Sequence, residues 1–174
     1  MPELDITWML PDGRVGGRGP DGTVSLTGGL PGDRVEYEET GRQGRTLLGR
    51  VTQVLTPSAD RVPPTCAWAS TCGGCDLAEL SLGAQRQHKA RVIQFAMRMD
   101  APPPLLTPQP STAYRGRIKL RFSKGHVGYH QASSHILVDA EQCAVSHPAI
   151  QVAHAQLRDW VAEHGHTGLS DVEL

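Results

Sequence analysis

The chain is poor in cysteine and in aromatic side chains, and it contains no long apolar run. Only four of its 174 residues are cysteine, and 5% are aromatic. No apolar stretch approaches the roughly 18 residues that a membrane helix requires, so we expect no contact with a membrane. With 39% hydrophobic residues, the chain has material for one medium domain or two small ones with modest cores.

The few cysteines are unevenly placed. Cys66, Cys72 and Cys75 lie in one short run, with two glycines between the last two, and Cys143 follows far downstream. Three thiolates on a loop and a fourth brought in by folding can hold a metal ion or an iron–sulfur cluster. Structural zinc sites usually consist of two short ligand pairs, so the spacing favours iron–sulfur and leaves zinc as the alternative.

An even number of cysteines also permits a disulfide framework. The N-terminal residues 1–6 have neither a basic start nor an apolar segment of signal-peptide length. We therefore expect a cytoplasmic protein in a reducing compartment, where structural disulfides are rare. Metal or cluster ligation is the favoured interpretation.

Charge is distributed unevenly along the chain, although the net charge is only -1. Residues 1–57 carry 6 Lys/Arg and 8 Asp/Glu, residues 58–135 carry 10 and 4, and residues 136–174 carry 1 and 6. A basic centre between acidic ends is typical of a protein that binds a polyanion, and RNA is the polyanion we expect.

Residues 1–57 alternate short β-prone runs with glycine and proline. The runs cover 5–9, 23–27, 34–38 and 47–55, which predicts a small all-β barrel of the OB-like kind that binds RNA. The glycine-rich stretch 13–19 is followed by another turn signal and not by a helix, so we interpret it as a turn and not as a phosphate loop.

After residue 57 the pattern changes to a mixture of helices and strands. Ser81 is placed to cap a helix that ends near residue 99, and Ser146 with Pro148 predicts a second helix that ends at Gly165. Strands are expected at 115–122, 126–130 and 135–138. The fold class is therefore α+β, with an N-terminal barrel, a cysteine loop, antiparallel strands and two helices.

Two groups of polar residues are candidates for RNA binding. Arg115, Arg117, Lys119 and Arg121 alternate with small or apolar residues, so they share one face of the expected strand. Gln85 and Lys89 share one face of the first helix. For Gln85 and Lys89 a solvated helix surface is the favoured interpretation from the residues alone, whereas at the strand the net positive charge of 58–135 favours contact with RNA phosphates.

The order of these motifs resembles the N-terminal part of the bacterial S-adenosylmethionine-dependent uracil C5 methyltransferases of 23S ribosomal RNA. The resemblance rests on Asp21-Gly-Thr-Val24, Gly28-Gly-Leu-Pro-Gly-Asp-Arg-Val35, Arg61-Val-Pro-Pro64, the cysteine run, Gln85-x3-Lys89, Tyr114-Arg115, and Asp139-x3-Cys143-x3-His147-Pro148. These motifs are specific in combination and extend through nearly the whole chain.

This resemblance implies a domain division and a cofactor. Residues 1–57 would form a TRAM domain that binds RNA, and residues 58–174 would carry the cluster and begin the central RNA-binding domain. Cys66, Cys72, Cys75 and Cys143 would ligate a [4Fe–4S] cluster with a structural role. The expected partner is 23S rRNA, bound by a monomer.

The resemblance stops short of the family's catalytic part. Members continue into a Rossmann-like domain that has a glycine-rich loop for S-adenosylmethionine, a cysteine nucleophile and an acidic residue for proton removal. This sequence contains no counterpart of that domain, and its four cysteines are all expected ligands. We therefore expect no methylation by this chain alone.

Two other interpretations stay open from the sequence. One is a self-sufficient RNA-binding module that combines a TRAM domain with a metal cluster, and the other is a binding protein stapled by zinc.

Overall fold

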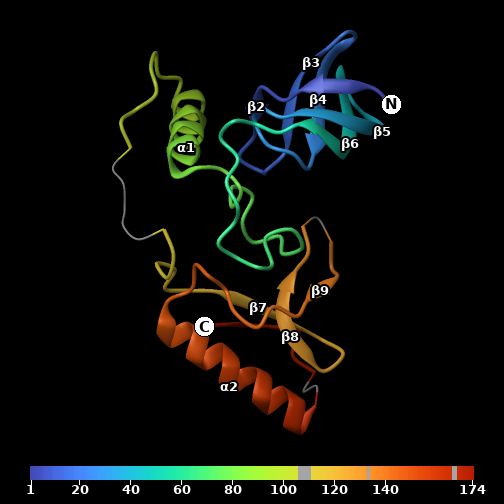
Figure 1. The fold of residues 1–174 in the computed structure, drawn as a ribbon. Coiled ribbons are helices and arrows are strands. Elements are labelled where there is room, and N and C mark those ends of the chain that lie inside the picture. The colour runs from blue at the N-terminus through green and yellow to red at the C-terminus, as the bar shows by residue number, and fades with distance from the viewer. Residues whose placement is uncertain (106–110, 133, 166–167) are drawn as a thin grey trace. The chain divides into compact units, whose positions relative to one another are not determined.

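The computed structural model describes residues 1–105, 111–132, 134–165 and 168–174. Within these residues the chain forms ten strands in two sheets and two helices, so the predicted α+β class is confirmed (Figure 1). None of the helices in this part of the chain is long and apolar enough to cross a membrane.

The chain divides into two compact units that interleave along the sequence. The first unit consists of Met1–Pro63 and Glu79–Leu105, and the second of Pro64–Ala78 and Leu106–Leu174. The segment with three cysteines thus belongs to the same unit as Cys143. The linear division at residue 57 into two functional domains stays a prediction.

The first unit contains a six-stranded sheet with the order β1-β5-β6-β4-β3-β2. Neighbouring strands are antiparallel, except that β4 and β6 run parallel. The strands are β1 (Glu3–Asp5), β2 (Trp8–Met9), β3 (Val15–Gly19), β4 (Gly22–Thr27), β5 (Arg34–Gln43) and β6 (Thr46–Thr56). The all-β character of this segment is as predicted, and its assignment as a TRAM-type barrel stays a prediction.

The glycine-rich stretch was wrongly interpreted as a turn, because Val15–Gly19 forms strand β3. Gly16 and Gly17 serve close packing: a Cβ atom at Gly16 would lie 2.1 Å from the carbonyl oxygen of Val24, and one at Gly17 would lie 2.3 Å from that of Asp5. Glycine is therefore required where neighbouring backbone approaches the strand.

The second unit contains a four-stranded antiparallel sheet with the order β10-β7-β8-β9. Its strands are β7 (Lys119–Ser123), β8 (His126–His130), β9 (Leu137–Val138) and β10 (Asp171–Glu173). Ile118, Leu120, Phe122 and Val127 form a buried core with Val161 of helix α2 (Pro148–His164). Figure 1 shows this helix running beside β7 and β8.

The predicted strand at 115–122 begins later than expected. Strand β7 starts at Lys119, while Arg115 makes an isolated parallel bridge with Ser146. The alternation is nevertheless correct on the apolar side, since Ile118, Leu120 and Phe122 are all buried.

Both predicted helices form, with one correction to their caps. Helix α1 (Leu82–Met97) begins after Ser81, whose hydroxyl accepts a hydrogen bond from the Ala84 amide at 3.2 Å, as predicted. Helix α2 is capped by His147 and not by Ser146; Nδ1 of His147 accepts a hydrogen bond from the amide of Ala149. Ser146 is buried instead.

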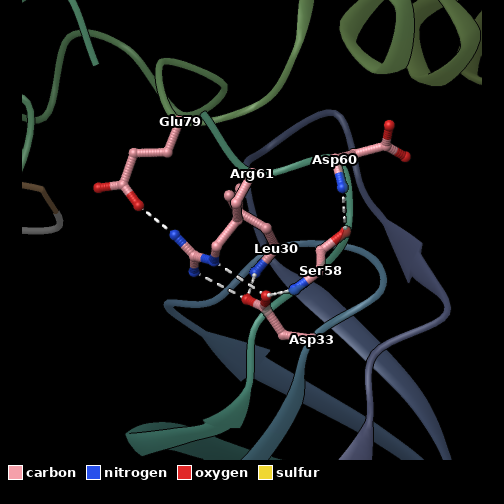
Figure 2. A network of polar contacts seen from close by, with 6 residues as sticks. All are labelled: Leu30, Asp33, Ser58, Asp60, Arg61 and Glu79. Carbon is pink, nitrogen blue, oxygen red and sulfur yellow. Dashed lines mark hydrogen bonds and ion pairs between the residues drawn. The ribbon is translucent and has the colours of Figure 1, made fainter. Parts of the chain in front are cut away.

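A buried carboxylate ties the end of the first sheet to the segment that follows it (Figure 2). Asp33 is fully buried as a side chain, and Arg61 binds both of its oxygens, through Nε at 2.9 Å and Nη2 at 2.8 Å. The amides of Leu30 and Ser58 donate to the same carboxylate at 2.7 and 2.8 Å, and Arg61 also pairs with Glu79. Burial opposes ionisation of Asp33, but these hydrogen bonds outweigh it and hold the pKa of Asp33 below its usual value.

We predict that Asp33→Asn lowers the free energy of unfolding by about 2 kcal/mol, because charge-assisted hydrogen bonds in a buried site are lost. Since the folded-state pKa is depressed, the stabilisation is present above the ordinary pKa of 3.8 and is lost as the pH falls through the folded-state value. Denaturant unfolding at neutral pH measures the difference. The control is Asp12→Asn, because Asp12 forms only an exposed pair with Arg14. Equal effects of the two substitutions would contradict the prediction.

Candidate metal centre

The cysteine loop is attached to the end of strand β8 by its backbone. Cys72 makes an antiparallel bridge with Gln131, and the Gly73 amide donates to the carbonyl oxygen of His130 at 2.9 Å. A Cβ atom at Gly73 would lie 2.7 Å from both the Cα atom and the amide nitrogen of Ala132. Glycine at position 73 therefore lets the loop approach this backbone closely.

Cys143 lies on the turn between β9 and α2, in the same unit. Its carbonyl oxygen accepts from the Ser146 amide at 3.0 Å and from the side-chain amide of Gln151 at 3.4 Å. Gln151 belongs to α2, so the turn is fixed to the helix that follows it. The fourth cysteine is thus held by local hydrogen bonds and not by a long flexible connection.

Cys66 and Cys143 lie close enough to Cys72 and Cys75 to act on these two thiols electrostatically. Burial raises the pKa of the Cys72 thiol, and the neighbouring Cys143 and Cys66 raise it further, against a hydrogen bond from the Gly74 amide. Burial also raises the pKa of Cys75, and Cys143, Cys72 and Cys66 add to this effect. The predicted set is therefore gathered in one neighbourhood. All four are free thiols.

The arrangement of these thiols does not by itself amount to a coordination site. Across the described ranges, no three His, Cys, Asp or Glu side chains stand in positions that could hold a metal ion. The cysteine ligand set therefore stays a prediction, supported by the proximity of the thiols.

Arg115 places a positive charge beside the thiols, where it lowers the pKa of Cys75 in opposition to burial and the other sulfurs. Its backbone is held by two hydrogen bonds, from its amide to the Val145 carbonyl at 2.8 Å and from the His147 amide to its carbonyl at 2.9 Å. Of the four predicted RNA-binding cations, Arg115 is therefore the one associated with the cysteines.

The other three cations lie opposite carboxylates of strand β10. Lys119 pairs with Asp171 at 2.6 Å, Arg121 with Asp171 at 3.3 Å, and Arg117 with Glu173 at 3.3 Å. This pairing depends on the antiparallel register of β10 with β7, which the sequence pattern does not reveal. Contact with RNA stays a prediction for these residues, and an anion would have to compete with Asp171 and Glu173.

Gln85 and Lys89 both lie on α1, but their side chains differ in what they do. The Gln85 side-chain amide donates to the Leu80 carbonyl at 2.9 Å, which stabilises the start of the helix. Lys89 is exposed. The structure therefore gives Gln85 a local structural contact in addition to any role in RNA binding.

Comparison with known proteins identifies relatives along nearly the whole chain. A 23S rRNA (uracil(1939)-C(5))-methyltransferase RlmD from Halomonas elongata is 38% identical over 91% of this chain and 35% of the relative. The enzyme of the same name from Burkholderia thailandensis is 31% identical over 93% of this chain and 38% of the relative. The chain is homologous to part of these RNA methyltransferases. The family resemblance drawn from the sequence motifs is thereby confirmed.

The chain spans only a little over a third of the length of these relatives. No protein-family model matches it. Among solved structures, the Pyrococcus abyssi tRNA (uracil-54, C5)-methyltransferase in complex with S-adenosyl-L-homocysteine matches 92% of this chain and 37% of that protein, with a TM-score of 0.61 and 19% identity. This match supports the fold alone.

Two residues of this region, Tyr129 and Ser146, carry no signal as site residues in the sequence. Each buries a hydroxyl group that makes no hydrogen bond of regular geometry among the described residues. The alternation in β8 could have indicated that Tyr129 lies on one face of the sheet, but its proximity to Cys143 depends on tertiary structure.

We predict that Gly73→Ala lowers the free energy of unfolding by about 1–3 kcal/mol, because the added methyl group collides with backbone atoms of Ala132. Gly74→Ala is the matched control, since a Cβ atom there would meet only the Cys72 sulfur at an ordinary 3.4 Å. Thermal or denaturant unfolding compares the two variants. If both glycines tolerate alanine equally, the loop does not approach the end of β8 as described.

Proposed function

We propose that this chain is the RNA-recognition and [4Fe–4S]-bearing portion of an S-adenosylmethionine-dependent uracil C5 methyltransferase that acts on 23S rRNA in the cytoplasm. The proposal is carried by the homology to proteins named as such enzymes, at 31% and 38% identity over more than nine-tenths of this chain. Methyl transfer, with its cofactor-binding loop, catalytic cysteine and general base, would require a part of the enzyme that this sequence does not contain.

In this proposal the two parts of the chain have different tasks. Residues 1–57 act as a TRAM domain with an OB-like barrel, and residues 58–174 hold the cluster and begin the central RNA-binding domain. The six-stranded sheet with its mixed order is compatible with a small RNA-binding barrel. The chain is proposed to act as a monomer.

The residues present fit an iron–sulfur cluster in their chemistry. Cys66, Cys72, Cys75 and Cys143 supply four thiols from one compact unit, and the effect of Cys66 and Cys143 on the pKa of Cys72 and Cys75 supports their proximity. When bound, the cluster would supply a structural cross-link between the cysteine loop and the turn before α2. Arg115 would offset part of the negative charge that four thiolates bring.

The cations of β7 and Arg117, which precedes this strand, are the proposed contact for RNA phosphates. Lys119, Arg121 and Arg117 are already accompanied by carboxylates, so RNA binding there would exchange protein ion pairs for phosphate contacts. Ion pairs at a protein surface contribute little to the free energy of unfolding. Replacing them with phosphate contacts therefore costs the folded protein little. Lys89 and Gln85 on α1 are proposed as a further contact.

The test of the proposal uses the whole chain purified without oxygen. We expect a coloured protein with about four iron and four sulfide per chain. Cys75→Ser should lose the cluster, melt at lower temperature and bind a labelled uridine-containing RNA oligonucleotide more weakly. Ser70→Ala, on the same loop, is the control and should retain all three properties. Zinc in place of iron would support the zinc-stapled alternative, and an unaffected Cys75→Ser variant would reject a structural centre.

A second prediction concerns the cations of β7. The double substitution Arg117→Ala and Lys119→Ala should weaken binding of the same RNA, and the slope of log affinity against log salt should fall by about 1.4, from two lost phosphate contacts. Asp171→Asn should act in the opposite direction, because it frees Lys119 and Arg121. Salt titrations of RNA binding measure both effects. If both variants show the same slope of log affinity against log salt as the parent, these cations do not contact RNA and belong to a solvated surface.

A further inference from the structure

Two buried hydroxyl groups in the second unit make no hydrogen bond of regular geometry in the described part of the chain. They belong to Ser146, which is 1% exposed, and to Tyr129 on β8. Buried polar groups in folded proteins are almost always hydrogen-bonded, so an unpartnered pair in one place requires an explanation. One explanation is a bound group that is not part of the polypeptide and that accepts these hydrogen bonds.

The Tyr129 hydroxyl lies near both the Cys143 sulfur and the Ser146 hydroxyl, because both groups act on it. Ser146 is held there by the turn in which its amide donates to the Cys143 carbonyl at 3.0 Å. Burial raises the pKa of Tyr129 above its usual range, the nearby Cys143 sulfur raises it further, and the Ser146 hydroxyl opposes the shift. A neutral thiol is a weak acceptor of hydrogen bonds, whereas a thiolate is a strong one.

The surrounding structure holds these side chains in position. Tyr129 is paired with Val138 of β9, and its ring packs edge-on against the His154 ring of α2, with the ring centroids 6.0 Å apart. Ser146 precedes α2, and the side chain of Gln151 donates to its carbonyl oxygen at 2.9 Å. The residues that carry the two hydroxyl groups are therefore held in place by the strand, the helix and the turn around them.

We propose that the hydroxyl groups of Tyr129 and Ser146 donate hydrogen bonds to the sulfur of Cys143 when this sulfur is a metal-bound thiolate. The inference rests on the proposed iron–sulfur function and extends it to two positioning residues. Their role is to hold Cys143 in position as the fourth ligand, because this cysteine has no other cysteine near it in the sequence. Groups that hydrogen-bond to metal ligands typically change metal affinity by 10–100-fold.

The test compares the anaerobic whole protein with Tyr129→Phe, Ser146→Ala and the double variant. The time course of iron release to a strong chelator should be about 10–100-fold faster in the double variant. The reduction potential of the cluster should fall, because hydrogen bonds to the ligand sulfurs tune it. Tyr37→Phe, which removes a hydroxyl group from a buried tyrosine of the other unit, should match the parent in both measurements.

Thermal unfolding distinguishes this role from ordinary packing. In the metal-free protein, Tyr129→Phe should be neutral or stabilising, because it removes a buried hydroxyl group that lacks a partner. In the loaded protein it should be destabilising, so the sign of the effect reverses on loading. Ser146→Ala should behave in the same way.

The outcomes separate the two proposals. A parent that holds a cluster, with Tyr129→Phe and Ser146→Ala unchanged in iron release, potential and the sign of the stability effect, overturns this inference alone. If the parent holds zinc in place of iron, chelator competition for zinc replaces iron release, and unchanged affinity in the variants again overturns the inference. A parent that binds neither metal nor cluster overturns both proposals.

Discussion

The second unit brings four sulfur atoms into one neighbourhood, and the account of this protein depends on that gathering. Burial and the neighbouring sulfurs raise the pKa of Cys72 and Cys75, so in the absence of a cation these thiols resist ionisation. A metal reverses this preference, since a coordinating thiol is deprotonated outright. The cost of gathering the sulfurs is then offset by the bonds that they form.

Backbone contacts, and not the thiols themselves, place the two cysteine-bearing segments. The loop is attached to the end of β8 through Cys72 and Gly73, and the Cys143 turn is attached to α2 through Gln151. In the first unit, Arg61 is bound to Asp33 just before the chain leaves for the cysteine loop, and Glu79, where the chain returns, binds the same guanidinium group. Both ends of the loop are thus fixed by one ion-pair network.

Helices and buried strand faces of this fold could be predicted from local sequence patterns. The features that could not be predicted depend on pairing between residues far apart in the sequence. The capping residue Ser81 and the buried alternation of Ile118, Leu120 and Phe122 follow from spacing within a single element. Strand β3 was missed because its three glycines have low strand propensity, and only the close approach of Val24 and Asp5 explains them. The pairing of Lys119 with Asp171, 52 positions apart, depends on sheet register, which a single sequence does not specify.

The candidate site shows the same division between local and tertiary information. The four cysteines were predicted as ligands from their number and their spacing along the chain. Tyr129 and Ser146 carried no comparable signal, because a tyrosine in a strand and a serine before a helix are ordinary. Their significance depends on burial beside Cys143, which only the folded chain brings about.

Alkylation of the cysteines in the native protein, counted by mass spectrometry, tests the central claim most directly. The account predicts that all four thiols of the anaerobic protein are protected together and become reactive together when the metal is removed by a chelator. Reaction of Cys143 at its unprotected rate, while Cys66, Cys72 and Cys75 remain protected, would show that the fourth sulfur does not join the other three.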